Sequence, residues 1–219
     1  ESNPNVYLSM GLTAENVAKK YDISRKSQQD FAINSHQKAN IANTNNHFYD
    51  EITKINSNDI TVEKDGTIRA NTSHETLNNL KLVFDKNGTI TAGTASPLTD
   101  GAAATLVCSE TYAKKNDLNI LAKIISTSVQ GCPPELMGLG PIEASKKALK
   151  RANLSINDID IVELNEAFAS QSLACIKDLN INPEIVNIDG GAIALGHPLG
   201  ATGVRITAKA AQLLKRENK

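Results

Sequence analysis

Several features that would classify a protein quickly are scarce in this sequence. Its three cysteines, Cys108, Cys132 and Cys175, are far apart and odd in number, which predicts neither a disulfide framework nor a paired-cysteine metal site and indicates a reducing compartment. No apolar run approaches the length of a membrane span. Lys and Arg total 23 against 24 Asp and Glu, so no basic excess favours a nucleic-acid partner.

The chain does have enough apolar residues for a sizeable core. It has 219 residues, of which 40% are hydrophobic, and this suffices for one or two domains. Because it begins at Glu1 rather than at a methionine, the lack of a visible targeting segment says little about localisation.

The first half of the chain is predicted to be mixed and rich in loops. We expect a short helix over residues 13–21 with Thr13 as its N-cap, and a longer helix from Ser24 to about residue 44, capped by Ser24. Residues 51–82 are polar and rich in Asn, Asp, Ser and Thr, which is typical of a surface excursion.

The second half predicts an α/β fold, because apolar strands alternate with helical patterns. The expected strands are residues 103–108, 121–129, 159–164 and 185–188, and the expected helices are residues 111–116, 142–153, 166–179 and 201–215. The helix over residues 167–179 is apolar nearly all round, which indicates burial on several sides. The change in character places a boundary near residues 96–98.

The most distinctive segment is Gly190-Gly-Ala-Ile-Ala-Leu-Gly-His197-Pro-Leu-Gly-Ala-Thr-Gly203. Its glycines would let the backbone approach a ligand closely, just before a helix begins. The spacing matches neither the GxxxxGK[ST] nor the GxGxxG phosphate-binding pattern. His197 lies within this loop, but a lone loop histidine is more often structural or solvent-exposed than catalytic.

Asn165-Glu-Ala-Phe168 follows an expected strand and opens an expected helix. Asn165 as an N-cap, with Glu166 favouring the helix dipole, would account for both residues. A rigid amide that orients a water or an oxyanion would account for Asn165 equally well. The residues alone do not choose between these interpretations.

Two further segments have small or apolar residues suited to a ligand chain. Residues 91–104, Thr-Ala-Gly-Thr-Ala-Ser96-Pro-Leu98-Thr-Asp-Gly-Ala-Ala-Ala, would let a ligand lie along the backbone, and a tight turn before a buried strand would account for them equally well. Residues 131–141 form a loop whose Met137 could line an apolar tunnel, although methionine is more often simple packing.

Taken together, these segments resemble the thiolase family. NEAF, GGAIALGHPLGATG, TAGTASPLTDGAAA and MGLGP occur in that family's order and roughly its spacing, and residues 10–17 and 23–32 extend the likeness towards the N-terminus. The resemblance implies a layered αβαβα fold. Residues 1–97 would be the latter part of the family's loop domain with its return to the core, and residues 98–219 most of the C-terminal domain.

The resemblance also implies a chemistry. A thiolase cysteine takes an acyl group from a 3-ketoacyl-CoA and passes it to coenzyme A, or runs the reverse Claisen condensation of acetyl-CoA. His197 matches the histidine that activates the cysteine and donates to the thioester oxygen, and a neighbouring imidazole does lower a thiol pKa. Asn165 matches the asparagine whose water completes the oxyanion hole.

Binding residues carry over in the same way. Ser96 matches a serine that contacts the pantetheine arm of coenzyme A, and Arg69 matches a basic residue near its nucleotide. The apolar walls of the pantetheine tunnel are matched by Phe84, Leu98, Met137 and Phe168. Coenzyme A is then a substrate, and no tightly bound cofactor is implied.

The sequence departs from the family at both cysteines. The nucleophile would lie upstream of Glu1, and the CxGxG cysteine beyond Lys219, so we expect the 219 residues alone to be inactive. Cys108 and Cys175 are interpreted as small core residues, and nothing near Cys132 in sequence would activate it. Ser9 replaces a histidine of the short-chain biosynthetic members, which favours the degradative type and a role in fatty acid metabolism.

Three hypotheses follow. The residues belong to a working thiolase, to a catalytically inactive thiolase fragment that binds coenzyme A or oligomerises, or to a related condensing enzyme, which the NEAF and GHPLGATG motifs disfavour. The resemblance implies a homodimer or homotetramer in a bacterial-type cytoplasm, with acyl-CoA and coenzyme A as partners and no nucleic acid or membrane. Acyl-chain length and reaction direction stay open.

Overall fold

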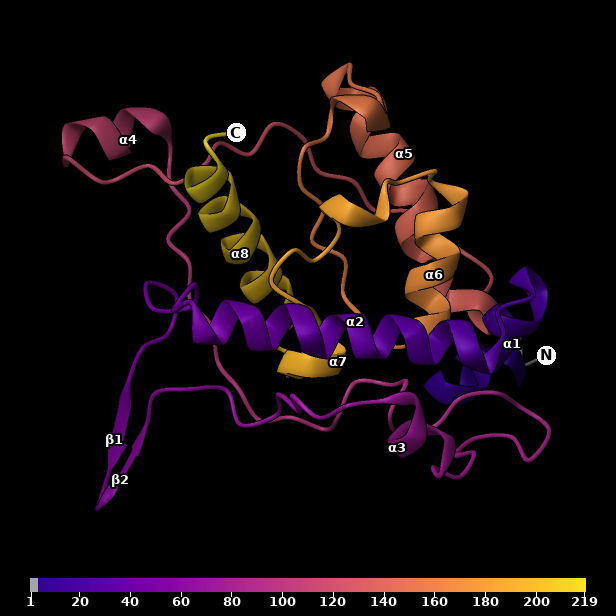
Figure 1. Cartoon of the computed structure of the whole chain (residues 1–219). Coiled ribbons are helices and arrows are strands. Elements are labelled where there is room, and N and C mark those ends of the chain that lie inside the picture. Colours follow the sequence, from indigo (N-terminus) through magenta and orange to yellow (C-terminus); the bar gives the residue numbers. More distant parts are fainter. Residues whose placement is uncertain (1–3) are drawn as a thin grey trace.

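The computed structural model describes residues 4–219 and consists mainly of helices joined by long extended segments (Figure 1). The α-helices are α1 (Met10–Tyr21), α2 (Arg25–Thr44), α3 (His74–Asn78), α4 (Glu110–Lys115), α5 (Gly140–Ala152), α6 (Ala169–Asp178), α7 (Ala192–Leu195) and α8 (Thr202–Glu217). Short 3-10 helices are η1 (Pro4–Tyr7), η2 (Pro134–Leu139), η3 (Ile156–Asp158) and η4 (Pro183–Ile185). Strands β1 (Ile55–Ser57) and β2 (Ile60–Val62) pair antiparallel. None of these helices is both long and apolar enough to cross a membrane.

Serine caps start the first two long helices. The predicted cap at Ser24 is confirmed, because its side chain accepts the backbone N–H of Ser27 at 3.1 Å. The predicted cap at Thr13 is wrong. Ser9 caps α1 instead, accepting from the N–H of Leu12 at 3.4 Å, so the helix begins three residues earlier than expected.

Helix α2 crosses the molecule, and both α6 and α7 pack against it (Figure 1). The burial predicted for residues 167–179 is confirmed in α6, where most side chains are inaccessible and Cys175 is 0% exposed. The helix starts at Ala169 rather than Glu166, and its N-cap is Phe168. Asn165 and Glu166 therefore precede the helix, and the N-cap interpretation of Asn165 is wrong.

The four strands predicted in the second half do not form a sheet in the described residues. Val162 and Val186 make a single parallel bridge, and residues 103–108 and 121–129 are extended without a neighbouring strand. A strand needs a partner for its backbone hydrogen bonds, whatever its side-chain pattern. Leu106 and Val107 are accordingly 73% and 71% exposed, and Cys108 is exposed rather than part of the core.

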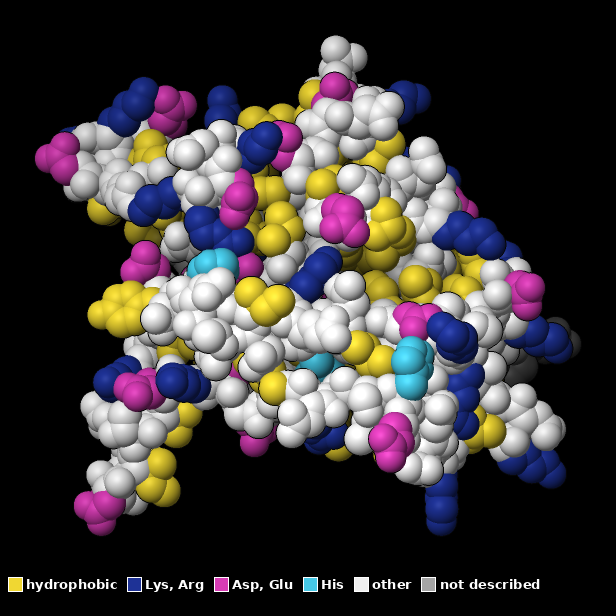
Figure 2. All heavy atoms as spheres, in the orientation of Figure 1, with side chains coloured by type: hydrophobic (Ala, Val, Ile, Leu, Met, Phe, Trp, Pro, Cys, Tyr) yellow, Lys and Arg dark blue, Asp and Glu magenta, His cyan; other side chains and the backbone are white. Residues whose placement is uncertain are grey.

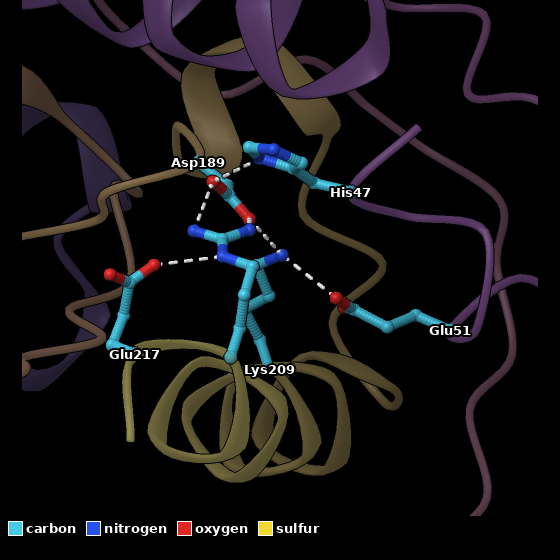
Figure 3. Close-up of polar contacts among 6 residues, drawn as sticks. His47, Glu51, Asp189, Lys209 and Glu217 are labelled. Carbon is cyan, nitrogen blue, oxygen red and sulfur yellow. Dashed lines mark hydrogen bonds and ion pairs between the residues drawn. The ribbon is translucent and has the colours of Figure 1, made fainter. Parts of the chain in front are cut away.

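Charged side chains of both signs are interspersed with apolar ones over the face drawn in Figure 2, consistent with a net charge near zero. A buried ionic cluster lies beneath the surface (Figure 3). Asp189 binds the guanidinium of Arg216 through both oxygens, at 2.7 and 3.0 Å, and also binds Lys209. Lys209 reaches Glu51 at 2.8 Å, and His47 contacts Asp189 at 3.3 Å. The cluster joins the chain after α2, the start of the glycine-rich segment and α8.

Candidate active site

His197 lies between α7 and α8, in a loop that the main chain fixes tightly. Gly196 precedes it with φ of +92°, and a Cβ there would lie 2.5 Å from the side chain of Thr99, so both conformation and space require glycine. The backbone N–H of His197 donates to Thr99 Oγ1 at 3.3 Å. The loop that carries His197 thus packs against the segment of small residues at positions 91–104.

The imidazole of His197 has a partner on each nitrogen. Nδ1 lies 2.7 Å from Thr202 Oγ1, and that hydroxyl donates to the carbonyl of Pro198 at 3.1 Å. Nε2 lies 3.4 Å from Asn165 Nδ2, which can only donate. The arrangement is satisfied when Nδ1 carries the proton and donates to Thr202, which leaves the Nε2 lone pair facing Asn165.

The electrostatic surroundings favour the neutral histidine. Partial burial lowers the pKa of His197, and the positive charge of Arg205 on α8 lowers it further. A neutral imidazole with an unprotonated Nε2 can accept a proton from a nearby acid, which is the property required of a general base.

The position of Asn165 fits the second interpretation of its motif, an amide that orients a water or an oxyanion. Its side chain is half-buried, its Nδ2 faces His197, and its Oδ1 is buried without a hydrogen-bond partner among the described residues. A buried amide oxygen of this kind has capacity to bind a small polar group. The pair of side chains thus offers a base and an amide side by side.

Ser96 is brought next to the same motif by main-chain pairing. Its N–H donates to the carbonyl of Ala167 at 2.9 Å, and the N–H of Ala169 donates to the carbonyl of Thr94 at 2.9 Å. Residues 94–96 and 167–169 therefore lie antiparallel, with Ser96 half-buried beside the Asn165 motif.

Phe84 and Phe168 form an edge-to-face pair with ring centroids 5.8 Å apart. A Cβ on Gly11 would lie 2.1 Å from the Phe84 ring, so the glycine allows the ring to rest on α1. Phe84 is still 36% exposed. Two of the four predicted apolar wall residues therefore meet, 84 residues apart in sequence.

The other predicted wall residues are less enclosed. Met137 lies in η2, which packs against α1 and α6, and is 43% exposed. Its neighbour Gly138 sits against Gln171 in the first turn of α6, shortly after Phe168. Leu98 is fully exposed, in the turn between Ser96 and Thr99. Both residues border the site without closing it.

Arg69 lies apart from these residues. Its side chain is exposed, and its backbone N–H donates to Nδ1 of His36 at 3.1 Å. Among the described residues, no hydrogen bond or ion pair links its side chain to His197 or to Asn165.

The marked surface hollows also lie elsewhere. One of about 660 Å³ is lined by α5, residues 153–158 and the end of α6, and one of about 320 Å³ by residues 46–51 and the end of α8. Neither of these two hollows is lined by a predicted site residue.

None of the three cysteines is poised as a nucleophile in the described residues. Burial raises the pKa of the Cys175 thiol to about 11, and its Sγ donates to the carbonyl of Gly138 at 3.5 Å. Cys132 is exposed, with its Sγ 3.8 Å from the carbonyl of Met137. The thiolate is the reactive form of cysteine, so Cys175 is disfavoured at neutral pH.

Sequence reasoning missed the residues that support the pair. Thr202 lies inside the glycine-rich motif, five residues after His197, and that spacing could have identified it. Glu166 was interpreted through the helix dipole, but it is 1% exposed and its carboxylate is bonded to distant segments. Ser35, one of its partners, lies 131 residues away on α2 and carries no local signal.

Comparison with known proteins accounts for nearly the whole chain. Residues 4–111 match the family model of the thiolase N-terminal domain, and residues 118–219 match that of the thiolase C-terminal domain. The 3-ketoacyl-CoA thiolase of Shewanella loihica is 50% identical over 95% of this chain and 56% of its own length. The acetyl-CoA acetyltransferase of Shinella zoogloeoides is 50% identical over 90% of this chain and 51% of its own length.

Solved structures agree with these matches and confirm the predicted fold. The Bacillus anthracis acetyl-CoA acetyltransferase superposes with a TM-score of 0.92 at 42% identity, covering 96% of this chain and 55% of that one. Human mitochondrial 3-ketoacyl-CoA thiolase in complex with CoA also gives 0.92 at 42% identity, covering 99% and 55%. The chain thus spans about half the length of the relatives it matches.

Proposed function

Because the chain belongs to the thiolase family, we propose that it is the larger part of an acyltransferase acting on coenzyme A thioesters. The reaction is the thiolysis of a 3-ketoacyl-CoA, or in reverse the condensation of two acetyl-CoA. The relatives' names include both 3-ketoacyl-CoA thiolase and acetyl-CoA acetyltransferase, so both directions stay within the proposal. A relative solved with CoA supports coenzyme A as a substrate.

The observation that carries the proposal is the contact between His197 and Asn165. In thiolysis the nucleophilic cysteine gives its proton to Nε2 of His197, and its thiolate attacks the 3-keto carbon. The bond to the α-carbon then breaks, and the acetyl-CoA enolate that leaves takes a proton from the thiol of the second catalytic cysteine. The thiol of a second CoA attacks the acyl-enzyme and releases the shortened acyl-CoA.

Asn165 and protonated His197 act on the developing charge. An enolate places negative charge on the thioester oxygen, and preorganised donors at that position contribute about 3 kcal/mol each to transition-state stabilisation. His197 supplies an N–H once it has accepted the thiol proton. The amide of Asn165 orients the water that supplies a second donor.

The pantetheine arm of coenzyme A is assigned to the surface around the aromatic pair. Phe84, Phe168, Met137 and Leu98 supply its apolar walls, Ser96 supplies a polar contact, and Arg69 approaches the nucleotide. The exposure of Leu98 and Met137 fits residues that await a ligand or a neighbouring part of the protein.

We place both catalytic cysteines in parts of the polypeptide outside these 219 residues, which form the latter part of the loop domain (1–97) and most of the C-terminal domain (98–219). The assembled enzyme is a homodimer or homotetramer in the cytoplasm. Ser9 at the start of α1 fits the degradative type and a role in fatty acid metabolism.

The test is CoA-dependent cleavage of acetoacetyl-CoA by the polypeptide that carries the cysteines. His197→Ala and Asn165→Ala should each lower turnover by about two orders of magnitude, since each removes a transition-state donor. His74→Ala is the matched control, because His74 is a half-exposed histidine paired with Asp30 on the surface, and it should keep wild-type turnover.

Wild-type rates in both site variants would contradict the assigned roles. The 219 residues alone should give no cleavage, and turnover by them would place the nucleophile among Cys108, Cys132 and Cys175.

A further inference from the structure

Glu166 is a buried carboxylate with donors from three separate parts of the chain. Its side chain is 1% exposed and accepts hydrogen bonds from Ser35 Oγ at 2.6 Å, Asn187 Nδ2 at 2.8 Å and the backbone N–H of Ile193 at 3.1 Å. These residues come from α2, from the turn before the glycine-rich segment and from α7. An acidic group so far from water persists only where such donors compensate its lost hydration.

The bonds to Ile193 and Ser35 act on the loop that carries His197. Ser35 Oγ, which donates to Glu166, also accepts the backbone N–H of Gly191 at 3.1 Å. Two amides of the segment leading to His197 are therefore held by the carboxylate, one directly and one through a hydroxyl. A Cβ on Gly191 would lie 2.2 Å from the Glu166 carboxyl, so this glycine permits the close approach.

The bond to Asn187 holds the segment that carries Asn165. The side chain of Asn187 accepts the N–H of Leu164 and donates to its carbonyl, both at 2.8 Å, in the manner of a neighbouring strand. The same amide also reaches Glu166. The residue before Asn165 and the residue after it are thus fixed by one buried network.

We infer that Glu166 is a positioning residue that holds His197 against Asn165, acting through Ser35, Ile193 and Asn187 without touching substrate. The catalytic importance of this role rests on the proposed function. The hydrogen bonds that hold the two segments in place do not depend on it. Burial raises the pKa of Glu166, and the hydrogen bonds from Ser35, Asn187 and Ile193 oppose that rise. These hydrogen bonds offset part of the rise in the pKa, which stays above the usual range of a glutamate.

The test compares Glu166→Gln with a matched variant elsewhere. Glutamine has the same shape but directs an NH₂ group at donors, so at least one bond of the network is lost. Glu15→Gln is the control, because Glu15 is also nearly buried and accepts the backbone N–H groups of Thr89 and Ile90 at 2.9 Å, remote from the His197 loop. Ser35→Ala removes the hydroxyl that donates to Glu166 and accepts the N–H of Gly191, and it keeps the carboxylate.

The first readout is nitrogen NMR of the 219-residue chain labelled at its four histidines, with His197→Ala as the assignment variant. In the wild type the two His197 ring nitrogens should be distinct, one protonated and one bare. In Glu166→Gln and in Ser35→Ala they should move towards each other, because the loosened ring exchanges tautomers. Glu15→Gln should lose similar thermal stability with unchanged His197 signals.

The second readout is thiolysis by the cysteine-bearing polypeptide. Glu166→Gln should lower kcat by about 10- to 100-fold, in line with the cost of a small misplacement, with the KM for CoA within twofold of wild type. If Glu166→Gln fails to fold, Ser35→Ala decides the question.

Unchanged His197 signals in the folded variants overturn the inference, even if turnover falls. If the wild type shows no turnover, the proposed function is overturned. If the His197 signals still change in Ser35→Ala, the positioning role of Glu166 stands.

Discussion

His36 illustrates how much a single buried side chain can couple this fold to pH. It lies on α2, is 6% exposed, and its Nδ1 accepts the N–H of Arg69 at 3.1 Å, which only a neutral imidazole can do. Burial, with a contribution from the charge of Arg69, lowers the pKa of His36 to about 4. The same environment that fixes the histidine also opposes its protonation.

The folded protein should therefore lose stability on acidification through His36. Its pKa is lower when folded than when unfolded, so the unfolded chain takes up the proton first, and stability falls as pH drops from about 6.5 to about 4. The loss should approach about 3 kcal/mol. His36→Asn keeps an acceptor near Nδ1 but does not titrate, so urea unfolding of this variant should vary less with pH over that range. Equal pH dependence in both proteins would contradict the assignment.

Some residues of the candidate site can be predicted from local sequence patterns, and others cannot. His197, Asn165, Ser96 and Phe168 stand in recognisable motifs, and Phe84 was assigned only through the family resemblance. The structure pairs His197 with Asn165, Ser96 with the segment that follows Asn165, and Phe84 with Phe168. The burial of Glu166 and its bond to Ser35 depend on how α2 packs against the glycine-rich segment. A contact across 131 residues leaves no periodicity in the sequence, so it could not be predicted.

At the scale of elements, α8 is anchored at both ends of its inner face. Thr202 in its first turn contacts His197, and Lys209 and Arg216 bind Asp189, the residue just before the glycine-rich segment. Lys209 also lies over the ring of Phe48 at 4.6 Å. One ionic cluster thereby joins Asp189, just before the glycine-rich segment, to α8, which follows that segment (Figure 3).

Asp189→Asn should weaken this anchor strongly at neutral pH. Burial raises the pKa of Asp189, but hydrogen bonds from Arg216 and Lys209 outweigh it and bring the pKa to about 2. The variant leaves buried Lys209 less compensated, and we expect a loss of about 3 kcal/mol in unfolding free energy. Because the folded pKa is depressed, the wild-type advantage should disappear as pH falls from about 4 to about 2.

Asp178→Asn is the control for this change. Its ion pair with Lys146 is partly exposed on both sides, so the loss should stay below about 1 kcal/mol. Equal losses in the two variants at neutral pH would show that the Asp189 cluster does not stabilise the fold.

Helices were easier to predict than strands for a physical reason. A helix satisfies its hydrogen bonds within itself, so local signals suffice to place it. The Ser24 cap places the start of α2, and α8, which has no side-chain cap, begins one residue and ends two residues later than expected. A strand depends on a neighbour, and the apolar runs at residues 103–108 and 121–129 have none in the described part of the chain. The strand prediction for these two runs is therefore wrong in the described residues, because strand pairing is not a local property of the sequence.

At the scale of the whole molecule, the exposed apolar residues and the open site have one explanation. Large side chains such as Leu106, Ile125 and Val129 are 65% or more exposed, while the chain covers about half the length of its relatives. Under the proposed function, the described residues supply a base and an amide, and the nucleophile comes from elsewhere in the polypeptide. We propose that the same regions cover these exposed apolar side chains.

The most direct measurement of the central claim is the location of the acyl group during the reaction. The cysteine-bearing polypeptide would be mixed with a 3-ketoacyl-CoA without free CoA, then digested and analysed by peptide mass spectrometry. We expect the acyl group on a cysteine outside the 219 residues, and much less of it in His197→Ala, because His197 takes the thiol proton. An acyl group on Cys108, Cys132 or Cys175, or equal labelling of wild type and His197→Ala, would contradict the account.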